Sequence, residues 1–363
     1  MTKKYDGSQD VAQMQHEMIG AKKLTDSNFE FNNHPEAQWF ASGGNMGLFI
    51  HFGISTVNSK VDLSWGMMAN KPWEQKMGVD YTVTPDEYFK LAKEFHPTDY
   101  NPEKWIRAIA EAGFTYAVFT TRHHDGFAMW PSQYGEFNTK HYLGGYDFVK
   151  LFVQACRKYN IKVCLYYSPP DWYYNRYYMS FHYGSVQGAN VMSFHDRPHF
   201  DMKHKPAEIP NKPMGWEDAF TEYVNHQIKE LITNYGRIDM LWFDGSIEQY
   251  GKAVSIEEIR KLQPWILVNP RLHHKGDFET FECRLPENKP NCIWEHEAIW
   301  AEGPWWAYME QSKEYRSVEW LLKTYEKVKE WNGNFLINAG PMADGSLPNE
   351  VYEKLESLKQ KLK

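Results

Sequence analysis

Short apolar runs alternate with amphipathic stretches along most of the chain. Runs of about four to eight apolar residues, rich in β-branched and aromatic side chains, are typical of buried strands. The expected strands are residues 46–52, 116–121, 161–167, 238–243, 266–268, 293–295 and 335–338. Between them, apolar side chains at helical spacing predict helices. The expected helices are residues 102–112, 146–159, 216–235, 318–331 and 350–363.

The alternation of strands and helices favours a parallel sheet, because parallel neighbours need a crossover connection that is usually a helix. The chain has 363 residues, which suits a closed barrel with long loops. No GxGxxG or P-loop motif follows an early strand, and this disfavours an open, doubly wound sheet. We therefore expect an α/β fold of the (β/α)8-like TIM-barrel type, somewhat irregular, as a single catalytic domain over residues 1–363.

Two segments depart from this rhythm. Residues 171–215 have no clear period and are rich in Tyr and His, so we expect a long loop insertion with a functional role. Residues 1–35 precede the first expected strand and are expected to form an N-terminal extension. Little sequence follows the last expected strand, and we expect no second domain after the barrel.

Composition narrows the function. The formal net charge of −7 does not suit a nucleic-acid-binding surface. No stretch is long enough to span a bilayer, and the N-terminus lacks the apolar run of a signal peptide. A cytoplasmic location and export with the signal removed both stay open, as does the oligomeric state. The four cysteines show no CxxC spacing, so we expect neither a zinc site nor a disulfide framework.

Polar and aromatic residues follow each expected strand, where a barrel builds its active site. They are His51, His123-His124-Asp125, Tyr166-Tyr167-Ser168, Asp244-Gly245 and Asn269-Pro270-Arg271. One such residue could be structural, but five groups in succession are hard to explain by packing. The chain also contains 15 Trp and 23 Tyr, whose rings provide flat faces for sugars, although many will belong to the core.

The residue types in this set point to glycoside hydrolysis. No GxSxG turn is present for serine-hydrolase chemistry. Glycoside hydrolysis needs two carboxylates that flank the scissile bond. Asp244 directly follows a buried run, and Gly245 lets the backbone turn sharply there, so Asp244 is a nucleophile candidate. The alternative is that Asp244 caps the next helix.

Several motifs resemble family 29 glycoside hydrolases, the α-L-fucosidases, over residues 39–348. The matching stretches are GLFIHFG at 47–53, TTRHHDGFAMWPS at 120–132, LYYS at 165–168, LWFDG at 241–245, NFLINAGP at 334–341 and Asp344-Gly345. The HHDGF element is the most specific of these. The resemblance implies that Asp244 is the nucleophile. It also implies that the sugar is bound by His51, His123, His124, Tyr166, Trp65, Trp242 and Arg271.

The resemblance leaves the acid/base residue less defined, because its position varies across the family. A recurring pattern, Asp-Phe-x-Thr-x-Glu, fits residues 277–282 and makes Glu282 the first choice. Glu295 is the rival. The remaining candidates are Glu287, Glu297 and Glu302.

Three departures from the family pattern are visible. Ser64 stands where a Glu often precedes the tryptophan that Trp65 matches. Asn269-Pro270-Arg271 replaces an Asn-Asp-Arg element, which predicts a different local backbone. Many members also carry a C-terminal β-sandwich, which we do not expect here.

The resemblance implies a retaining exo-glycosidase that removes terminal α-L-fucosyl residues from fucosylated oligosaccharides or glycoconjugates through a covalent glycosyl-enzyme. It implies no cofactor, no metal, and neither a nucleic-acid nor a membrane partner. An apolar wall is expected for the C6 methyl group of fucose, with Phe127, Trp65 and Trp242 as candidates. The alternatives are a related glycosidase for α-L-galactosides or similar sugars, and a sugar-binding barrel without catalysis.

A metal site is the remaining alternative. His195-Asp196, His199 and His204 loosely resemble a metal-binding pattern within the long loop. His123 and His124 are a poorer metal pair, because adjacent side chains of a strand face opposite ways. For the same reason we expect one of these two histidines to support the sugar site without contacting the sugar.

Overall fold

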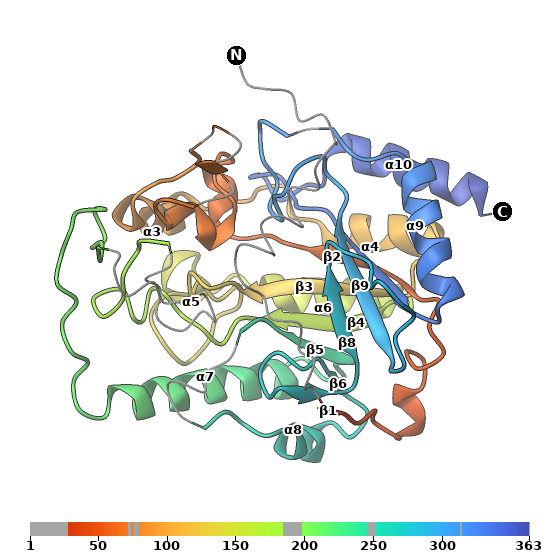
Figure 1. Cartoon of the computed structure of the whole chain (residues 1–363), viewed down its shortest axis with the longest axis horizontal. Helices are drawn as coiled ribbons and strands as arrows, with labels where there is room; N and C mark the ends of the chain where they lie inside the picture. Colours follow the sequence, from red (N-terminus) through yellow and green to blue (C-terminus); the bar gives the residue numbers. More distant parts are fainter. Residues whose placement is uncertain are drawn as a thin grey trace.

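The computed structural model describes residues 28–71, 74–75, 78, 80–183, 198–245, 252–312 and 314–362. Within this part of the chain, eight parallel strands form one curled sheet (Figure 1). They are β2 (Met46–Ile50), β3 (Tyr116–Arg122), β4 (Lys162–Tyr167), β5 (Met240–Phe243), β6 (Leu267–Val268), β8 (Glu279–Glu282), β9 (Trp294–Ile299) and β10 (Asn334–Asn338). Neighbours in the sheet follow chain order, and β10 pairs with β2. The predicted α/β barrel class is confirmed.

The sheet closes at Asp277, between β6 and β8. The Asp277 peptide N–H donates to the Val268 carbonyl at 2.8 Å, and the Asp277 carboxylate accepts from the Val268 N–H at 2.6 Å. The same carboxylate accepts from the Asn32 N–H and from the Arg260 guanidinium, both at 2.7 Å. Beside this joint, β1 (Asn28–Phe29) pairs with β7 (Lys275–Gly276).

The described helices lie around the sheet (Figure 1). They are α3 (Pro85–Glu94), α4 (Pro102–Glu111), α5 (Thr139–Tyr142), α6 (Phe148–Lys158), α7 (Trp216–Thr233), α8 (Ile256–Leu262), α9 (Val318–Glu330) and α10 (Asn349–Lys361). Short 3₁₀ helices are η1 (Pro35–Ala37), η2 (Ile54–Val57) and η3 (Leu63–Met67). In Figure 1, α7 and α8 run below the sheet, and α9 and α10 lie to its right. None of the described helices combines the length and apolar character needed to cross a bilayer.

Most of the long helices begin with an N-cap residue that has a short polar side chain, either Ser, Thr, Asn or Asp. Thr84 and Glu87 form a capping box at α3, and Ser255 and Glu258 form another at α8. These caps satisfy peptide N–H groups that have no partner inside the helix. The connections from β6 to β8 and from β8 to β9 are both fully described and contain no helix, which makes this part of the barrel irregular.

Both faces of most strands are buried, which explains why these strands appear as apolar runs in the sequence. Leu48 and Ile50 pack outward against the helices, and Phe49 between them points into the barrel interior. The interior also holds Tyr116, Tyr166 and Trp242, so aromatic rings line it together with aliphatic groups such as Val118.

The structure adds elements that periodicity does not predict. Strand β8 is half-buried and polar, and β9 extends to Ile299, beyond the expected range. Of the long loop, residues 171–183 and 198–215 are described and form no helix or strand. Most of the expected N-terminal extension lies outside the described residues, and the extent of the catalytic domain over 1–363 stays a prediction.

We expect Asp277→Ala to lower the free energy of unfolding by about 2–4 kcal/mol, because it removes the acceptor of three donors at the barrel joint. Asp277→Asn should have a smaller effect. Urea denaturation measures both. The exposed ion pair of Lys158 and Glu103 provides the control, since Glu103→Ala should leave the unfolding midpoint unchanged. Equal midpoints for Asp277→Ala and Glu103→Ala would show that Asp277 does not close the barrel.

Candidate active site

Asp244 lies directly after β5 at the carboxyl ends of the strands, and its side chain is 22% exposed. One carboxylate oxygen accepts from the Tyr166 hydroxyl at 2.7 Å. The other accepts from Arg271 Nη1 at 2.9 Å. The N-cap of the next described helix, α8, is Ser255, so Asp244 does not cap it. The carboxylate is therefore held by side chains that converge from three strand ends.

These contacts keep Asp244 ionised. Burial acts to raise its pKa, but His124, Arg271 and the Tyr166 hydroxyl outweigh burial and hold the pKa below its usual value. Burial also lowers the pKa of His124, so its ring is neutral near pH 7. The permanent positive charge that faces Asp244 is therefore the Arg271 guanidinium.

The same guanidinium joins Asp244 to Glu282. Arg271 Nη2 forms a close ion pair with Glu282 Oε1, while Nη1 holds Asp244. Glu282 ends β8, and its side chain is 10% exposed. The guanidinium lies 4.8 Å from the centre of the Trp242 ring. One cation thus places two carboxyl groups at the mouth of the barrel.

The Asn-Pro-Arg element at residues 269–271 allows Arg271 to reach both carboxyl groups, because Asn269 is fixed to the end of β5. Its amide donates to the Phe243 carbonyl and accepts from the Phe243 N–H, both at 2.8 Å. These two bonds fix the last residue before Asp244. Pro270 then leads directly to Arg271, which reaches Asp244 and Glu282 as described.

Three histidines surround the same space, each held at Nδ1. His51 Nδ1 shares a hydrogen bond with Asn338 Oδ1 at 2.7 Å, and burial lowers the pKa of His51 to about 4. Two serine hydroxyls hold the other two rings, each at 2.5 Å, in the pairs His123–Ser64 and His124–Ser168. Holding Nδ1 leaves Nε2 as the atom that can meet a ligand.

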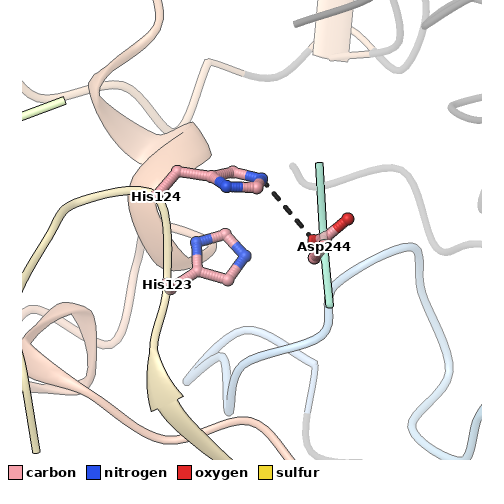
Figure 2. A group of neighbouring side chains, drawn as sticks. All are labelled: His123, His124 and Asp244. Carbon is pink, nitrogen blue, oxygen red and sulfur yellow. Dashed lines mark ion pairs between the residues drawn. The ribbon is translucent and has the colours of Figure 1, made fainter. Parts of the chain in front are cut away.

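The expectation that His123 and His124 face opposite ways is wrong. Strand β3 ends at Arg122, so the two residues lie in the turn beyond it and the alternation of a strand does not apply. Their ring centres are 4.3 Å apart, and both rings lie beside Asp244 (Figure 2). Both histidines are therefore available to a ligand at Asp244.

Aromatic rings complete the surroundings. Trp65 meets His124 and Trp172 edge-on, at 5.8 and 5.3 Å between ring centres. Trp306 lies 5.1 Å from His51. Trp172 and Trp306 come from loops, and no periodic pattern in the sequence distinguishes them from core tryptophans. Phe127 is different, because it packs against Phe95, Phe137 and Tyr142 in the core beneath the helices.

Comparison with known proteins decides the family. The α-L-fucosidase family profile matches residues 11–363. The chain belongs to the α-L-fucosidase family. Mouse tissue α-L-fucosidase is 24% identical over 93% of this chain and 72% of its own length. For the human tissue enzyme the identity is 24%, over 89% of this chain and 67% of its own length.

Solved structures agree with this assignment. An α-L-fucosidase isoenzyme from Paenibacillus thiaminolyticus has a TM-score of 0.72 and 27% identity, over 90% of this chain and 75% of that one. A family 29 α-L-fucosidase from Bacteroides thetaiotaomicron has a TM-score of 0.70 at 22% identity, over 94% of this chain and 77% of that one, and supports the fold. The predicted family and enzyme class are confirmed.

Glu295, the rival acid/base candidate of this fucosidase, lies inside the barrel. It is fully buried and accepts from the Tyr116 hydroxyl at 2.7 Å and from Trp242 Nε1 at 2.9 Å. In register, Glu295 faces Thr280, whereas Glu282 lies two residues further toward the mouth. This position favours Glu282. Glu287 is exposed and paired with Arg284.

Glu297 pairs in register with Glu282 and is fully buried beside Glu295. No hydrogen-bond donor of the described residues reaches its carboxyl oxygens. Burial, together with the neighbouring Glu295, raises the pKa of Glu297 well above its usual value, and this favours its protonated form.

One group of described residues has the spacing for a metal ion. Ligand atoms of His123, His124 and Asp244 all lie within 4.8 Å of one another (Figure 2). Of the loop pattern expected from the sequence, His195 and Asp196 lie outside the described residues. His204 Nε2 instead shares a hydrogen bond with the Met67 carbonyl at 2.9 Å, which ties the loop to η3.

We expect Tyr166→Phe to move the acidic limb of the kcat/KM profile to higher pH by about one unit, since a hydrogen bond to a charged group is worth about 1.5–3 kcal/mol. Removing the hydroxyl donor raises the pKa of Asp244, and the ionised form is then lost at a higher pH. Rates on an aryl α-L-fucoside between pH 3 and 8 measure the limb. Tyr167→Phe is the matched control, because its hydroxyl binds Gln227. If the acidic limbs of Tyr166→Phe and the parent coincide, the Tyr166 hydroxyl does not lower the pKa of Asp244.

Proposed function

We propose that this fucosidase hydrolyses terminal α-L-fucosyl groups with retention of configuration, with Asp244 as nucleophile and Glu282 as acid/base. The observation that carries the assignment is the Arg271 guanidinium, which contacts both carboxyl groups. Retaining glycosidases hold these groups about 5–5.5 Å apart, a separation that two carboxylates bound to one guanidinium can meet.

The reaction proceeds in two displacements. Asp244 attacks the anomeric carbon, the bond from that carbon to the leaving oxygen breaks, and Glu282 gives its proton to that oxygen. Water then attacks the same carbon, Glu282 takes the water proton, and the bond to Asp244 breaks. Two inversions at one carbon return the original configuration.

Arg271 supports both steps with one positive charge. Before the first step, the negative charge resides on Asp244 and the proton on Glu282. In the glycosyl-enzyme, Asp244 is a neutral ester and Glu282 is the anion. The sum of charges at the guanidinium is the same in both states, so the site needs no large reorganisation between steps.

The neutral histidines supply recognition. His51, His123 and His124 are fixed at Nδ1, so each presents Nε2 to a sugar hydroxyl. Trp65 and Trp306 provide apolar faces near these rings, and together they offer a wall for the C6 methyl group. Phe127 is excluded from that wall by its place in the core. The substrate is thus a fucosylated oligosaccharide or glycoconjugate.

We expect Asp244→Ala to lower kcat on an aryl α-L-fucoside by roughly 10³-fold or more while the fold persists. Added azide should restore turnover and give the β-L-fucosyl azide, because azide then replaces the nucleophile in a single displacement. Product NMR and far-UV circular dichroism check both points. Parent-like turnover without azide would remove Asp244 from the mechanism. A parallel panel with an aryl α-L-galactoside tests the sugar preference.

We expect Glu282→Ala to be rescued by azide with the α-L-fucosyl azide as product, because azide attacks the glycosyl-enzyme in the second displacement. Glu295→Ala should show no rescue and a lower melting temperature, since it leaves Tyr116 and Trp242 without their acceptor. Glu287→Ala is the exposed control. Rescue of Glu295→Ala, with Glu282→Ala near parent activity, would reverse the assignment.

A further inference from the structure

The space between His124 and Asp244 poses a chemical problem. Ser168 Oγ donates to the Pro170 carbonyl at 3.1 Å, so it must accept from the Nδ1–H of His124 at 2.5 Å. A neutral ring protonated at Nδ1 has a lone pair at Nε2. That lone pair faces Asp244 Oδ2 at 3.6 Å, which is too long for a hydrogen bond. Two acceptors therefore face each other. Asp244 Oδ2 also accepts from the Tyr166 hydroxyl, so a donor or a cation placed between the two groups would satisfy the lone pair of His124 Nε2.

His123 adds a third ligand atom to this space. Its ring is held at Nδ1 by Ser64, as His124 is held by Ser168. Histidines that bind metals are oriented in the same way, by a hydrogen bond at the other ring nitrogen. Figure 2 shows the two rings and the Asp244 carboxylate turned toward a common centre.

The distances suit a small tetrahedral ion. Zinc bonds of about 2.0–2.1 Å to nitrogen and about 2.0–2.2 Å to oxygen place two tetrahedral ligands roughly 3.4 Å apart. The 3.6 Å between His124 and Asp244 is close to this edge. The largest separation in the group is within 4.8 Å, so a side-chain shift of about 1 Å completes the set. The partly exposed Asp244 side chain leaves a fourth position for water.

We propose that His123, His124 and Asp244 form a binding site for a divalent transition ion of the zinc type, which excludes the sugar. Two imidazoles and one carboxylate favour zinc-like ions over magnesium or calcium. The ion is an inhibitor rather than a cofactor, because it would occupy the carboxylate that attacks the sugar. Arg271, 2.9 Å from the other Asp244 oxygen, weakens the site and keeps binding reversible.

Metal binding is tested on the whole protein, independently of turnover. Co²⁺ added to chelator-treated protein should give tetrahedral visible absorption without a thiolate charge-transfer band, and Zn²⁺ should displace it at one ion per chain. We expect His123→Ala to weaken Zn²⁺ binding by calorimetry about 100-fold or more, beyond what loss of an outer contact does. Asp244→Asn is a second, isosteric variant with the same expectation.

The control is His226→Ala, whose ring stacks on Tyr134 away from the site, and it should bind Zn²⁺ as the parent does. Parent-like binding by both His123→Ala and Asp244→Asn, or a thiolate band, would overturn the proposal. Kinetically, Zn²⁺ should raise KM for an aryl α-L-fucoside and leave kcat unchanged, and a falling kcat at constant KM would contradict it. The competition rests on the proposed function, but the spectroscopic result stands or fails without it.

Discussion

The arrangement of the site depends on one guanidinium shared by two carboxyl groups. Arg271 holds Asp244 with one nitrogen and Glu282 with another, and its plane lies over Trp242. A single positive charge stabilises one negative charge best, and a retaining mechanism keeps one negative charge on this pair of carboxyls throughout. In the proposed mechanism the charge moves from Asp244 to Glu282 when the glycosyl-enzyme forms, and Arg271 contacts both groups. This fixed cation is a preorganised electrostatic partner of the kind that lowers reorganisation in catalysis.

The position of Arg271 depends in turn on the barrel interior. Trp242, on which the guanidinium lies, donates its indole N–H to Glu295. Glu295 accepts from two donors, and burial beside Glu295 raises the pKa of Glu297 well above its usual value. A buried carboxyl pair is a weak source of stability. Its value here is geometric, since it fixes the rotation of Trp242 directly beneath the catalytic cation. A barrel filled with aliphatic side chains would offer no such anchor.

The residues that meet at the carboxyl ends of the strands could be predicted from the sequence, because their positions follow from the topology of the barrel. Once the apolar runs predicted a barrel, Asp244, Tyr166 and Arg271 had to meet at one end of it, and they do. Strand β8 escaped prediction, because its side chains are half-buried and its polar pattern resembles a loop. Phe127 was misplaced because a phenylalanine beside a site residue looks the same in sequence whether it faces the sugar or the core. The predicted orientation of His123 and His124 was wrong for a related reason. Side chains alternate between the two faces only within a strand, and β3 ends at Arg122, before both residues.

The partners of the histidines explain why the site separates recognition from proton transfer. An Asn and two Ser side chains hold His51, His123 and His124, and none of the three rings has a carboxylate at Nδ1. A carboxylate there would favour the charged ring and raise its pKa. With neutral partners, burial dominates, and the pKa values of all three rings are lowered. Neutral rings can bind sugar hydroxyls without competing for the catalytic proton, so in the proposed mechanism that proton is carried by Glu282 alone near neutral pH. Neutral rings also leave Nε2 lone pairs beside the Asp244 carboxylate. The groups that can bind a sugar hydroxyl can therefore also bind a small cation.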